Sequence, residues 1–521
     1  MQHLPIGIQN FEDLRRKNFK YVDKTAIAYQ LADSGKYYFL SRPRRFGKSL
    51  FLSTLEAYFQ GKKELFQGLA IEQLEKDWIE YPILRLDLNT EKYQDSEALN
   101  AILQYHLELW ETQLGIETKE TILGLRFMQI IQLAYEKTGK QVVVLVDEYD
   151  KPLLQAIGNS ELQDVYRATL KSFYGALKSC DQYIRFAFLT GVTKFSKVSI
   201  FSDLNNLVDI SMMPQYYDIC GITEQELYEQ LGEEVVALAQ TQNEIVEAMY
   251  AKLKELYDGY HFTQETSWNG KQLVGIYNPF SLLNALQYRR MGNYWFETGT
   301  PTYLVELLKK HNYNLNKLET EAITLPDLNG VDSSYSCPIP VLFQSGYLTI
   351  KGYDSKFKKY LLGFPNMEVK EGFVNFLLPY YIPPKTNKSE FDVALFVTDL
   401  EEGNIEDFMM RLQAFMADCP YEIQAEQERH FQSIMFILSS LCGFYTELEK
   451  HTNKGRMDMT IKTDQYIYIF EFKFNASAEI ALQQIHDKGY IEPFKADSRQ
   501  IVCIGVNFSS EARNIDKWIV E

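Results

Sequence analysis

The C-terminal region reads Gly455-Arg456-Met457-Asp458 and then Tyr466-Ile467-Tyr468-Ile469-Phe470-Glu471-Phe472-Lys473-Phe474. The second stretch is rich in aromatic and β-branched residues, which is typical of a β-strand. Side chains alternate between the two faces of a strand, so Glu471 and Lys473 are expected on the same face. Asp458 precedes this strand and can lie on its neighbour. Two carboxylates and one ammonium on one face suit a hard divalent cation that activates water.

This arrangement resembles the PD-(D/E)xK nuclease superfamily. The resemblance implies that Asp458 and Glu471 bind Mg²⁺, and that Lys473 orients the attacking water or stabilises the charged transition state. Gln484, on the following helix, matches an auxiliary position of the superfamily. A further acidic ligand usually comes from an earlier helix, and Glu428 in the segment 426–431 fits that place. The alternative interpretation of Glu471 and Lys473 is a solvated ion pair at a strand end.

A second site is indicated near the N-terminus. Tyr37-Tyr38-Phe39-Leu40 reads as a buried strand, and it is followed by Ser41-Arg42-Pro43-Arg44-Arg45-Phe46-Gly47-Lys48-Ser49 and an apolar helical run. Strand, loop, Gly-Lys-Ser and helix is the context of a phosphate-binding loop. Lys48 would reach the β- and γ-phosphates of a nucleotide, and Ser49 would ligate Mg²⁺. The usual pattern has glycine five residues before Gly47, where this chain has Arg42.

The acidic half of a nucleotide site is predicted about 100 residues further on. Gln141-Val142-Val143-Val144-Leu145-Val146 suits a strand buried on both faces of a parallel sheet, and it ends in Asp147 and Glu148. Asp147 would hold Mg²⁺ through water, and Glu148 would polarise the attacking water. A third strand, 183–189, runs into Thr190 and Thr193. In P-loop ATPases of the AAA+ and STAND kind a polar residue at this place senses the γ-phosphate, and the resemblance implies this role for Thr190 or Thr193. The alternative is a strand that runs into a turn.

Five stretches of the N-terminal region resemble the family called AAA-ATPase-like, which is commonly joined to a PD-(D/E)xK domain. The matching stretches are 4–11, 21–25, 42–49, 146–152 and 195–207. The family carries Arg-Pro-Arg-Arg in its loop, so the resemblance explains Arg42. It implies an ATP site formed by Arg42, Arg44, Arg45, Phe46, Gly47, Lys48, Ser49, Asp147 and Thr190. Arg44 and Arg45 would touch phosphate or lie as solvated charges on the loop.

The remaining segments predict a multidomain α/β protein. Its parts are a P-loop core with a parallel sheet (1–210), a helical lid (211–330), a small winged-helix-like connector (331–385) and a restriction-endonuclease-like α/β domain (390–521). Amphipathic periodicity in 224–257 indicates the lid helices. A helix end followed by two strands in 338–365 indicates the connector, and Pro383-Pro384 marks a linker.

Composition excludes several other classes of protein. At 521 residues the chain exceeds a single core, and 68 Tyr and Phe residues (35 and 33) argue against disorder. Six scattered cysteines without a Cys-x-x-Cys pair indicate neither a zinc site nor a disulfide framework. No secretion signal and no apolar run of roughly 20 residues is visible, so a cytoplasmic, non-membrane protein is expected. The net charge of −17 does not itself favour nucleic-acid binding, although bound Mg²⁺ can supply positive charge locally.

The sequence therefore predicts an ATP-binding and hydrolysing protein coupled to a Mg²⁺-dependent nuclease, with DNA favoured as the nucleic-acid substrate. The alternative is a nucleotide-dependent switch or scaffold NTPase whose nuclease fold is a non-cleaving binding module. Oligomeric state, and any arginine acting from a neighbouring subunit, cannot be assigned from spacing.

Overall fold

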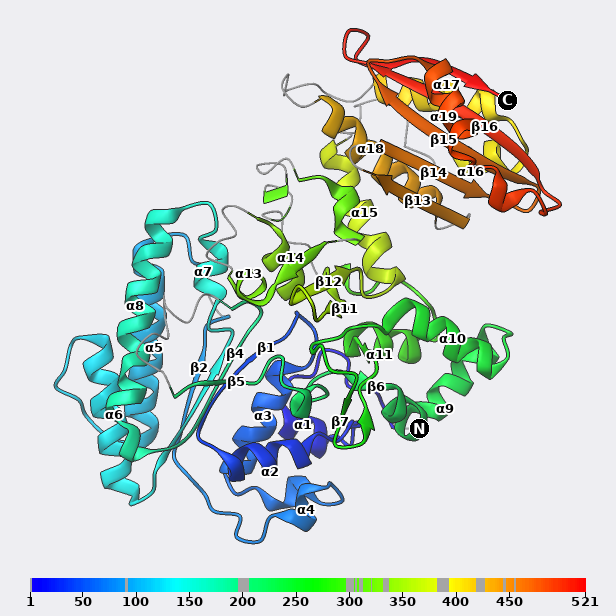
Figure 1. Ribbon diagram of the computed structural model, residues 1–521. Helices are drawn as coiled ribbons and strands as arrows, with labels where there is room; N and C mark the ends of the chain where they lie inside the picture. Colours follow the sequence, from blue (N-terminus) through cyan, green and yellow to red (C-terminus); the bar gives the residue numbers. More distant parts are fainter. Residues whose placement is uncertain are drawn as a thin grey trace. The chain divides into compact units, whose positions relative to one another are not determined.

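The computed structural model describes residues 2–89, 92–194, 206–296, 304, 307–308, 313–319, 321–330, 337–381, 393–417, 427–443, 447–453 and 456–521. The chain divides into two compact units. The first unit contains Met1–Leu307 and Glu321–Val369, and the second contains Leu308–Thr320 and Lys370–Glu521. Each unit is built around its own sheet, shown in blue to cyan for the first and in orange to red for the second (Figure 1).

A five-stranded parallel sheet forms the centre of the first unit. Its order is β2-β3-β4-β1-β5, with the strands β1 (Tyr37–Ser41), β2 (Ile83–Asp87), β3 (Val142–Asp147), β4 (Ile184–Gly191) and β5 (Val208–Asp209). Every residue of β3 is buried, as expected for an apolar strand covered on both faces. Because β4 lies between β1 and β3, the strand that precedes the Gly-Lys-Ser loop and the strand that ends in Asp147 both adjoin β4.

Helices cover both faces of this sheet (Figure 1). One face carries α3 (Lys48–Phe59), against which α1 (Phe11–Arg16) and α2 (Thr25–Ser34) pack. The other face carries α5 (Ser96–Leu114), α6 (Leu123–Thr138) and α8 (Ser160–Ser179), which pack on one another, with a stacked Phe127–Phe173 pair between α6 and α8. Two short helices, α4 (Ile71–Leu74) and α7 (Lys151–Gln155), complete this part.

The helices predicted for the lid are α9 (Glu224–Thr241), α10 (Val246–Tyr257) and α11 (Pro279–Tyr288). They share one apolar core with Leu4. At the start of α9, Thr223 and Glu226 form a reciprocal capping box. The short strands β6 (Ile222–Thr223) and β9 (Ile276–Tyr277) pair beside these helices, and β7 (Ser267–Trp268) pairs with β8 (Lys271–Gln272).

A small antiparallel sheet of order β10-β12-β11 completes the first unit. It contains the predicted helix-and-hairpin arrangement, with α14 (Ile339–Gln344) followed by β11 (Thr349–Asp354) and β12 (Lys359–Gly363). The third strand, β10 (Ala322–Thr324), and the helix α13 (Leu325–Asn329) come from residues before the predicted hairpin. Two helices followed by a hairpin, with one edge strand from upstream, form a winged-helix-like unit.

The second unit is a mixed sheet of order β13-β14-β15-β16-β17. Its strands are β13 (Glu447–Asn453), β14 (Arg456–Lys462), β15 (Tyr466–Phe474), β16 (Gln500–Ser509) and β17 (Asn514–Val520). Only the pair β15–β16 is parallel, and α19 (Ala478–Lys488) makes the crossover between these two strands. Helices α16 (Val393–Glu401), α17 (Ile405–Ala417) and α18 (Gln427–Cys442) precede the sheet, and α15 (Met367–Tyr381) leads into this unit.

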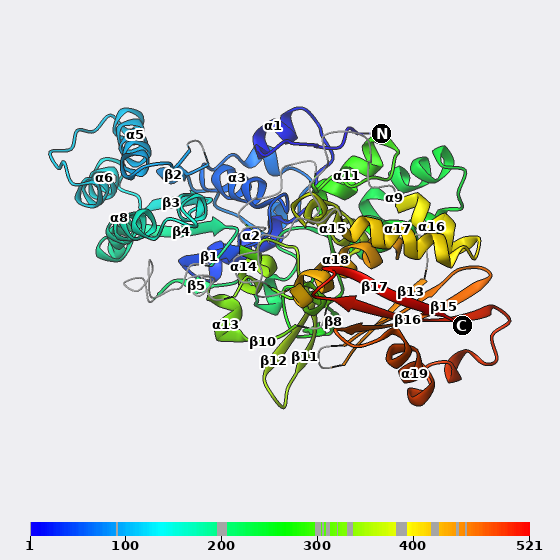
Figure 2. The ribbon, with the colours of Figure 1, turned by 90° about the horizontal axis from the view of Figure 1, so that it is seen from above.

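The two faces of this sheet have different neighbours. Tyr468, Phe470 and Phe472 of β15 share a core with buried residues of α16, α17 and α18. Ile467 and Ile469, on the opposite face, pack with Ile485 of α19. Strand alternation therefore places Glu471 and Lys473 on the α19 face. Figure 2 shows α19 on one side of the sheet, and α16 and α17 on the other.

Candidate nucleotide and metal sites

The loop between β1 and α3 has the geometry of a phosphate-binding loop. Gly47 adopts φ 93°, a left-handed conformation that glycine tolerates without strain, and it caps the N-terminus of α3. Arg45 also has a positive φ of 66°. The first N–H groups of a helix have no partner within the helix and carry its positive dipole end, so they attract an anion.

Lys48 lies beneath this loop. Its side chain is buried, and its Nζ donates to the carbonyl oxygens of Arg42 and Pro43, each at 3.1 Å. Ser49, the next residue of α3, faces the same pocket as Lys48. An ammonium held by two neutral carbonyls keeps its full charge available for a phosphate group. The residues present at this loop therefore fit the phosphate groups of a nucleoside triphosphate.

Asp147 and Thr190 meet at the carboxyl ends of two adjacent strands. Val146 of β3 pairs with Leu189 of β4, so the next residues, Asp147 and Thr190, face each other. Thr190 Oγ1 donates to Asp147 Oδ1 at 2.8 Å, and both side chains are buried. Thr193, the other sensor candidate, donates instead to Asp150 Oδ2 at 2.6 Å. The contact with Asp147 distinguishes Thr190 as the threonine that lies closer to the acid predicted to bind Mg²⁺.

Glu148 has a strained backbone and a perturbed carboxyl group. Its φ of 51° lies in the left-handed region, which is uncommon for residues other than glycine and often marks a functional position. Burial raises the pKa of Glu148, because the desolvation of the carboxylate outweighs the attraction of Lys48 and Lys151. A carboxyl group with a raised pKa beside a pocket is suited to accept a proton from water.

Lys48, Ser49 and Glu148 line an open pocket of about 1240 Å³, whereas Asp147 and Thr190 are not among its lining residues. The residues that surround it are Pro5, Ile6, Gly7, Ile8, Gln9, Arg44, Arg45, Gly47, Lys48, Ser49, Leu50, Asn89, Glu148, Lys151, Pro279, Phe280, Leu283 and Asn284. A mainly apolar pocket of about 610 Å³ adjoins it and shares Pro5, Gly47, Leu50, Pro279 and Leu283 with it. A polar pocket beside an apolar one matches the two ends of a nucleotide, phosphates and base.

Sequence reasoning did not assign the walls formed by Pro5–Gln9 and by the start of α11. Both segments are apolar and carry no ionisable group, so no chemical signal marked them. The segment 4–11 was noted only for its family resemblance. Its place in the fold, beside the phosphate loop, follows from packing that spacing along the chain does not reveal.

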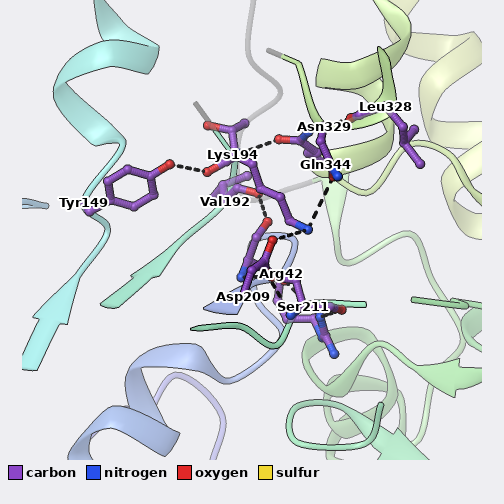
Figure 3. Close-up of polar contacts among 11 residues, drawn as sticks. Arg42, Tyr149, Val192, Lys194, Asp209, Ser211, Leu328, Asn329 and Gln344 are labelled. Atoms are coloured by element: carbon purple, nitrogen blue, oxygen red, sulfur yellow. Dashed lines mark hydrogen bonds and ion pairs between the residues drawn. The ribbon is translucent and has the colours of Figure 1, made fainter. Parts of the chain in front are cut away.

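The four residues Arg42, Arg44, Arg45 and Phe46 have different surroundings. Arg42 is buried, stacks over the Phe262 ring at 4.0 Å and donates to the carbonyl oxygens of Ser41, Ser211 (2.6 Å), Tyr216 and Tyr217, as Figure 3 shows for Ser211. Burial lowers its pKa to about 10, and it supports the loop through backbone carbonyls. Arg44 and Arg45 line the polar pocket, whereas Phe46 is buried against Tyr260 and Phe262.

The residues that follow β4 are hydrogen-bonded to the winged-helix-like unit (Figure 3). The backbone N–H of Lys194 donates to Gln344 Oε1 at 2.5 Å, and Gln344 Nε2 donates to the carbonyl oxygen of Leu328 at 2.8 Å. Lys194 Nζ also pairs with Asp209 Oδ2 at 3.1 Å. The segment that follows Thr190 is thus linked to α13 and α14 by hydrogen bonds.

A second cluster lies on the α19 face of the sheet in the second unit. Glu471 is fully buried, and Lys473 Nζ lies 2.5 Å from Glu471 Oε1 and donates to Gln484 Oε1 at 2.7 Å. The structure thus brings together three of the predicted residues, from β15 and α19. A carboxylate with no exposed surface is costly unless it is paired or binds a cation, and here Lys473 is a partner of Glu471. The clustering of Glu471, Lys473 and Gln484 on one face is the arrangement that the sequence predicts for the metal site.

Asp458 and Glu428 are placed by their backbones alone, because their side chains lie outside the described residues. Asp458 pairs in register with Glu471 across the β14–β15 ladder. Directly opposite residues of an antiparallel pair belong to the same face of the sheet. Glu428 lies in the first turn of α18. Among the described residues, which omit these two carboxylates, no group of three or more acidic, histidine or cysteine side chains is arranged for a metal.

Close packing of α19 on β16 holds Gln484 in place, and Gly505 makes this packing possible. Gly505 pairs with Glu471 across the β15–β16 ladder. A Cβ atom at Gly505 would lie 2.6 Å from the backbone nitrogen of Leu482 and also against the carbonyl oxygen of Ala478, where no flexible side chain can yield. α19 therefore approaches the strand only because residue 505 has no side chain.

We expect Gly505→Val to destabilise the second unit by about 2 kcal/mol or more, because the new side chain must push α19 away from the sheet. Thermal and urea unfolding of the full chain would measure this, with Gly175→Ala as the control, because Gly175 lies inside α8 of the first unit and a Cβ atom there meets no other atom within 4 Å. Unchanged unfolding of the Gly505 variant would show that α19 is not held against β16.

The geometry defines a P-loop ATPase core followed by a nuclease-superfamily fold, and the comparisons with known proteins agree. The family model described as a predicted AAA-ATPase matches residues 5–201, and that of the PD-(D/E)XK nuclease superfamily matches residues 426–518. An uncharacterized protein in the vnfD 5' region of Azotobacter chroococcum mcd 1 is 37% identical over 531 residues, covering 99% of this chain and 98% of the relative.

The chain therefore belongs to the AAA-ATPase-like family with a C-terminal PD-(D/E)XK nuclease superfamily domain, and both predicted resemblances are confirmed. Among solved structures, the Aeropyrum pernix ORC2 protein in ADPNP–ADP complexes matches at 13% identity and a TM-score of 0.22. That match covers 68% of this chain and 88% of the other. A TM-score this low carries no argument. In the described residues, no helix has the length and apolar character required to cross a bilayer.

Proposed function

We propose that this protein binds and hydrolyses ATP with Mg²⁺ in its first unit and cleaves nucleic acid, with DNA as the favoured substrate, in its second. The observation that carries the nuclease half is the buried Glu471 beside Lys473 and Gln484, with Asp458 opposite Glu471 in the sheet register. The same four residues were predicted from the sequence for one site.

In the first unit, the backbone N–H groups after Gly47 and the Lys48 ammonium would hold the phosphates, and Ser49 and Asp147 would hold Mg²⁺. The bound ion would neutralise charge on the β- and γ-phosphates. Glu148 would orient water and accept its proton, and Thr190 would keep the Asp147 carboxylate in position through the 2.8 Å hydrogen bond. The apolar pocket beside Leu50 and Leu283 would take the base.

In the second unit, Asp458 and Glu471 would hold the divalent cation, with Glu428 as a further ligand, and the ion would activate water for in-line attack on phosphorus. Lys473 would then orient that water or stabilise the negative charge of the transition state. Gln484 would fix the position of the ammonium through its amide oxygen. We also propose the finer division into core, lid, connector and nuclease domain, at residues 1–210, 211–330, 331–385 and 390–521.

Cleavage of plasmid and single-stranded DNA and of RNA, with Mg²⁺ or Mn²⁺ and with EDTA, tests the nuclease half. We expect metal-dependent cleavage by the wild type and none by Asp458→Ala. If the wild type binds nucleic acid but does not cut any substrate, the second unit is a binding module and the chain is a nucleotide-controlled scaffold.

A buried polar group offers a route by which the two activities are coupled. Glu368, at the start of α15, is fully buried, and its Oε1 accepts from the Trp295 backbone N–H at 2.8 Å and from Ser281 Oγ at 2.9 Å. The Trp295 indole Nε1 donates to the carbonyl oxygen of Arg44 in the phosphate loop at 3.3 Å. Ser281 lies in α11, next to Phe280 of the pocket wall. The Glu368 carboxylate therefore contacts the lid helix α11 directly and the phosphate loop indirectly, through Trp295.

We expect Glu368→Gln to reduce the effect of nucleotide on cleavage by about five-fold or more, because the amide weakens both hydrogen bonds of a fully buried anion. Cleavage rates with and without a slowly hydrolysed ATP analogue measure this, together with hydrogen exchange of residues 367–381. Glu371→Gln, on the same helix, is the matched control. Equal nucleotide responses of wild type and Glu368→Gln would contradict this route.

A further inference from the structure

Lys151 is a lining residue of the polar pocket that does not belong to the phosphate loop. It lines the pocket together with Lys48, Glu148 and Asn89. Its Nζ donates to Asn89 Oδ1 at 2.7 Å and lies 4.0 Å from Glu148 Oε2. The ammonium is thus held at the end of β2 and next to the strained acid that follows β3. No sequence motif for nucleotide hydrolysis assigned a role to this residue.

The local surroundings of Lys151 are electrostatically unfavourable for a positive charge. It is the first residue of α7, where the helix dipole disfavours a positive charge, and its side chain is partly buried, with 21% exposed. The contacts with Asn89 and Glu148 offset this cost. An ammonium has three N–H donors, and Asn89 accepts from one of them, so Lys151 can hold Asn89 and also face a phosphate oxygen.

We propose that Lys151 is the cation that this chain supplies to its own hydrolytic site: it holds Glu148 in position beside the pocket and neutralises charge on the transferring phosphoryl group during hydrolysis. The inference rests on the proposed ATPase function. It assigns within one chain the positive charge that ring-forming ATPases receive from an arginine of a neighbouring subunit.

The proposed reaction is the hydrolysis of ATP by one water molecule. The water oxygen bonds to the γ-phosphorus, and the bond from the γ-phosphorus to the β–γ bridging oxygen breaks, leaving its electron pair on ADP. The water proton passes to Glu148 and then to solvent, and the products are ADP and inorganic phosphate. Negative charge is spread over the γ-oxygens and the bridging oxygen in the transition state. Lys48 holds the loop side of this group, and Lys151 lies on the Glu148 side, where the water enters.

Arg44 and Arg45 are the competing cations, since both line the same pocket. They belong to the phosphate loop, and the Arg45 guanidinium lies over the Phe280 ring at 4.8 Å. Neither has a described contact with Glu148. Lys151 is therefore the cation whose position is tied to the acid that handles the water.

The test compares the binding of ADP with that of ADP·AlF₄⁻, a mimic of the transition state, in the full-length protein with Mg²⁺. We expect Lys151→Ala to bind ADP within about two-fold of the wild type but to bind ADP·AlF₄⁻ at least about 100-fold more weakly. Lys151→Arg should restore most of the difference. Arg44→Ala, Arg45→Ala and the exposed Lys178→Ala are the matched comparisons, and thermal unfolding monitors folding of each variant.

Two results would overturn the role of Lys151 but not the ATPase proposal. In the first, Lys151→Ala binds ADP·AlF₄⁻ as tightly as the wild type does. In the second, Arg44→Ala or Arg45→Ala loses affinity for ADP·AlF₄⁻ and Lys151→Ala does not. A wild type that binds ADP·AlF₄⁻ no better than ADP would overturn the ATPase proposal and this role with it. Because the cation comes from the same chain, ATP turnover per molecule should also stay constant over a 100-fold dilution of the wild type. A fall on dilution would indicate a cation from a neighbouring subunit.

Discussion

Glu471→Gln should lower metal-dependent cleavage of nucleic acid by more than about 100-fold. The amide has the size of the carboxylate but lacks its charge, so the divalent cation loses one of its proposed ligands. Changes to groups that only support a metal ligand typically cost 10–100-fold, so loss of the ligand itself should exceed that range. Cleavage rates across a range of Mn²⁺ concentrations, with calorimetric titration of the metal, measure the effect.

The control for this variant is Glu479→Gln. Glu479 is an exposed residue of the first turn of α19, where it pairs with Lys517. The Glu479→Gln substitution removes a carboxylate from the same unit and leaves the Glu471–Lys473 pair unchanged. If Glu471→Gln cleaved as fast as Glu479→Gln while remaining folded, Glu471 would be a partner of Lys473 in an ion pair and not a metal ligand.

Glu148→Gln should lower ATP hydrolysis by about 10²–10⁴-fold and leave ATP binding nearly unchanged, because the amide can still orient water but cannot accept its proton. Phosphate release and fluorescent-nucleotide binding measure the two quantities separately. Glu161→Gln, at the exposed start of α8, is the control. Parallel losses of binding and hydrolysis would mean that Glu148 holds the nucleotide and does not act on water.

The decrease of the wild-type rate of ATP hydrolysis at low pH (the acid limb of the pH profile) should also depend on the ionisation of Glu148. Its pKa is raised above the ordinary 4.5 by burial, and the carboxyl group must be ionised to accept a proton. Hydrolysis should therefore fall as pH decreases through this raised value, at a higher pH than an ordinary glutamate would give. The limb should be absent from the residual activity of Glu148→Gln.

Much of the fold and part of each site could be predicted from local patterns. Apolar strands that end in Asp147 or contain Glu471 are marked by composition and period, and Gly47 at a helix start is marked by its motif. Strand alternation was enough to place Glu471 and Lys473 on one face. These features depend on neighbours along the chain, so the sequence displays them directly.

Features formed by distant segments could not be predicted. Arg42 was assigned to the nucleotide, yet its guanidinium binds carbonyl oxygens of residues 211–217, whose proximity depends on the whole first unit. Glu368 lies outside the matching stretches, and Lys151 lies within one of them without an assigned role. The proposed roles of both depend on partners far away in the sequence, such as Trp295 and Asn89. The base-side wall from Pro5 and Leu283 is likewise a product of packing.

The most direct test is a crystal structure of the full chain with a non-hydrolysable ATP analogue and Mn²⁺, with anomalous scattering used to locate the metal. We predict two manganese positions, one between the nucleotide phosphates and Ser49 with Asp147 nearby, and one bound by Asp458 and Glu471. A nucleotide bound away from Lys48, or no manganese at Asp458 and Glu471, would contradict the account.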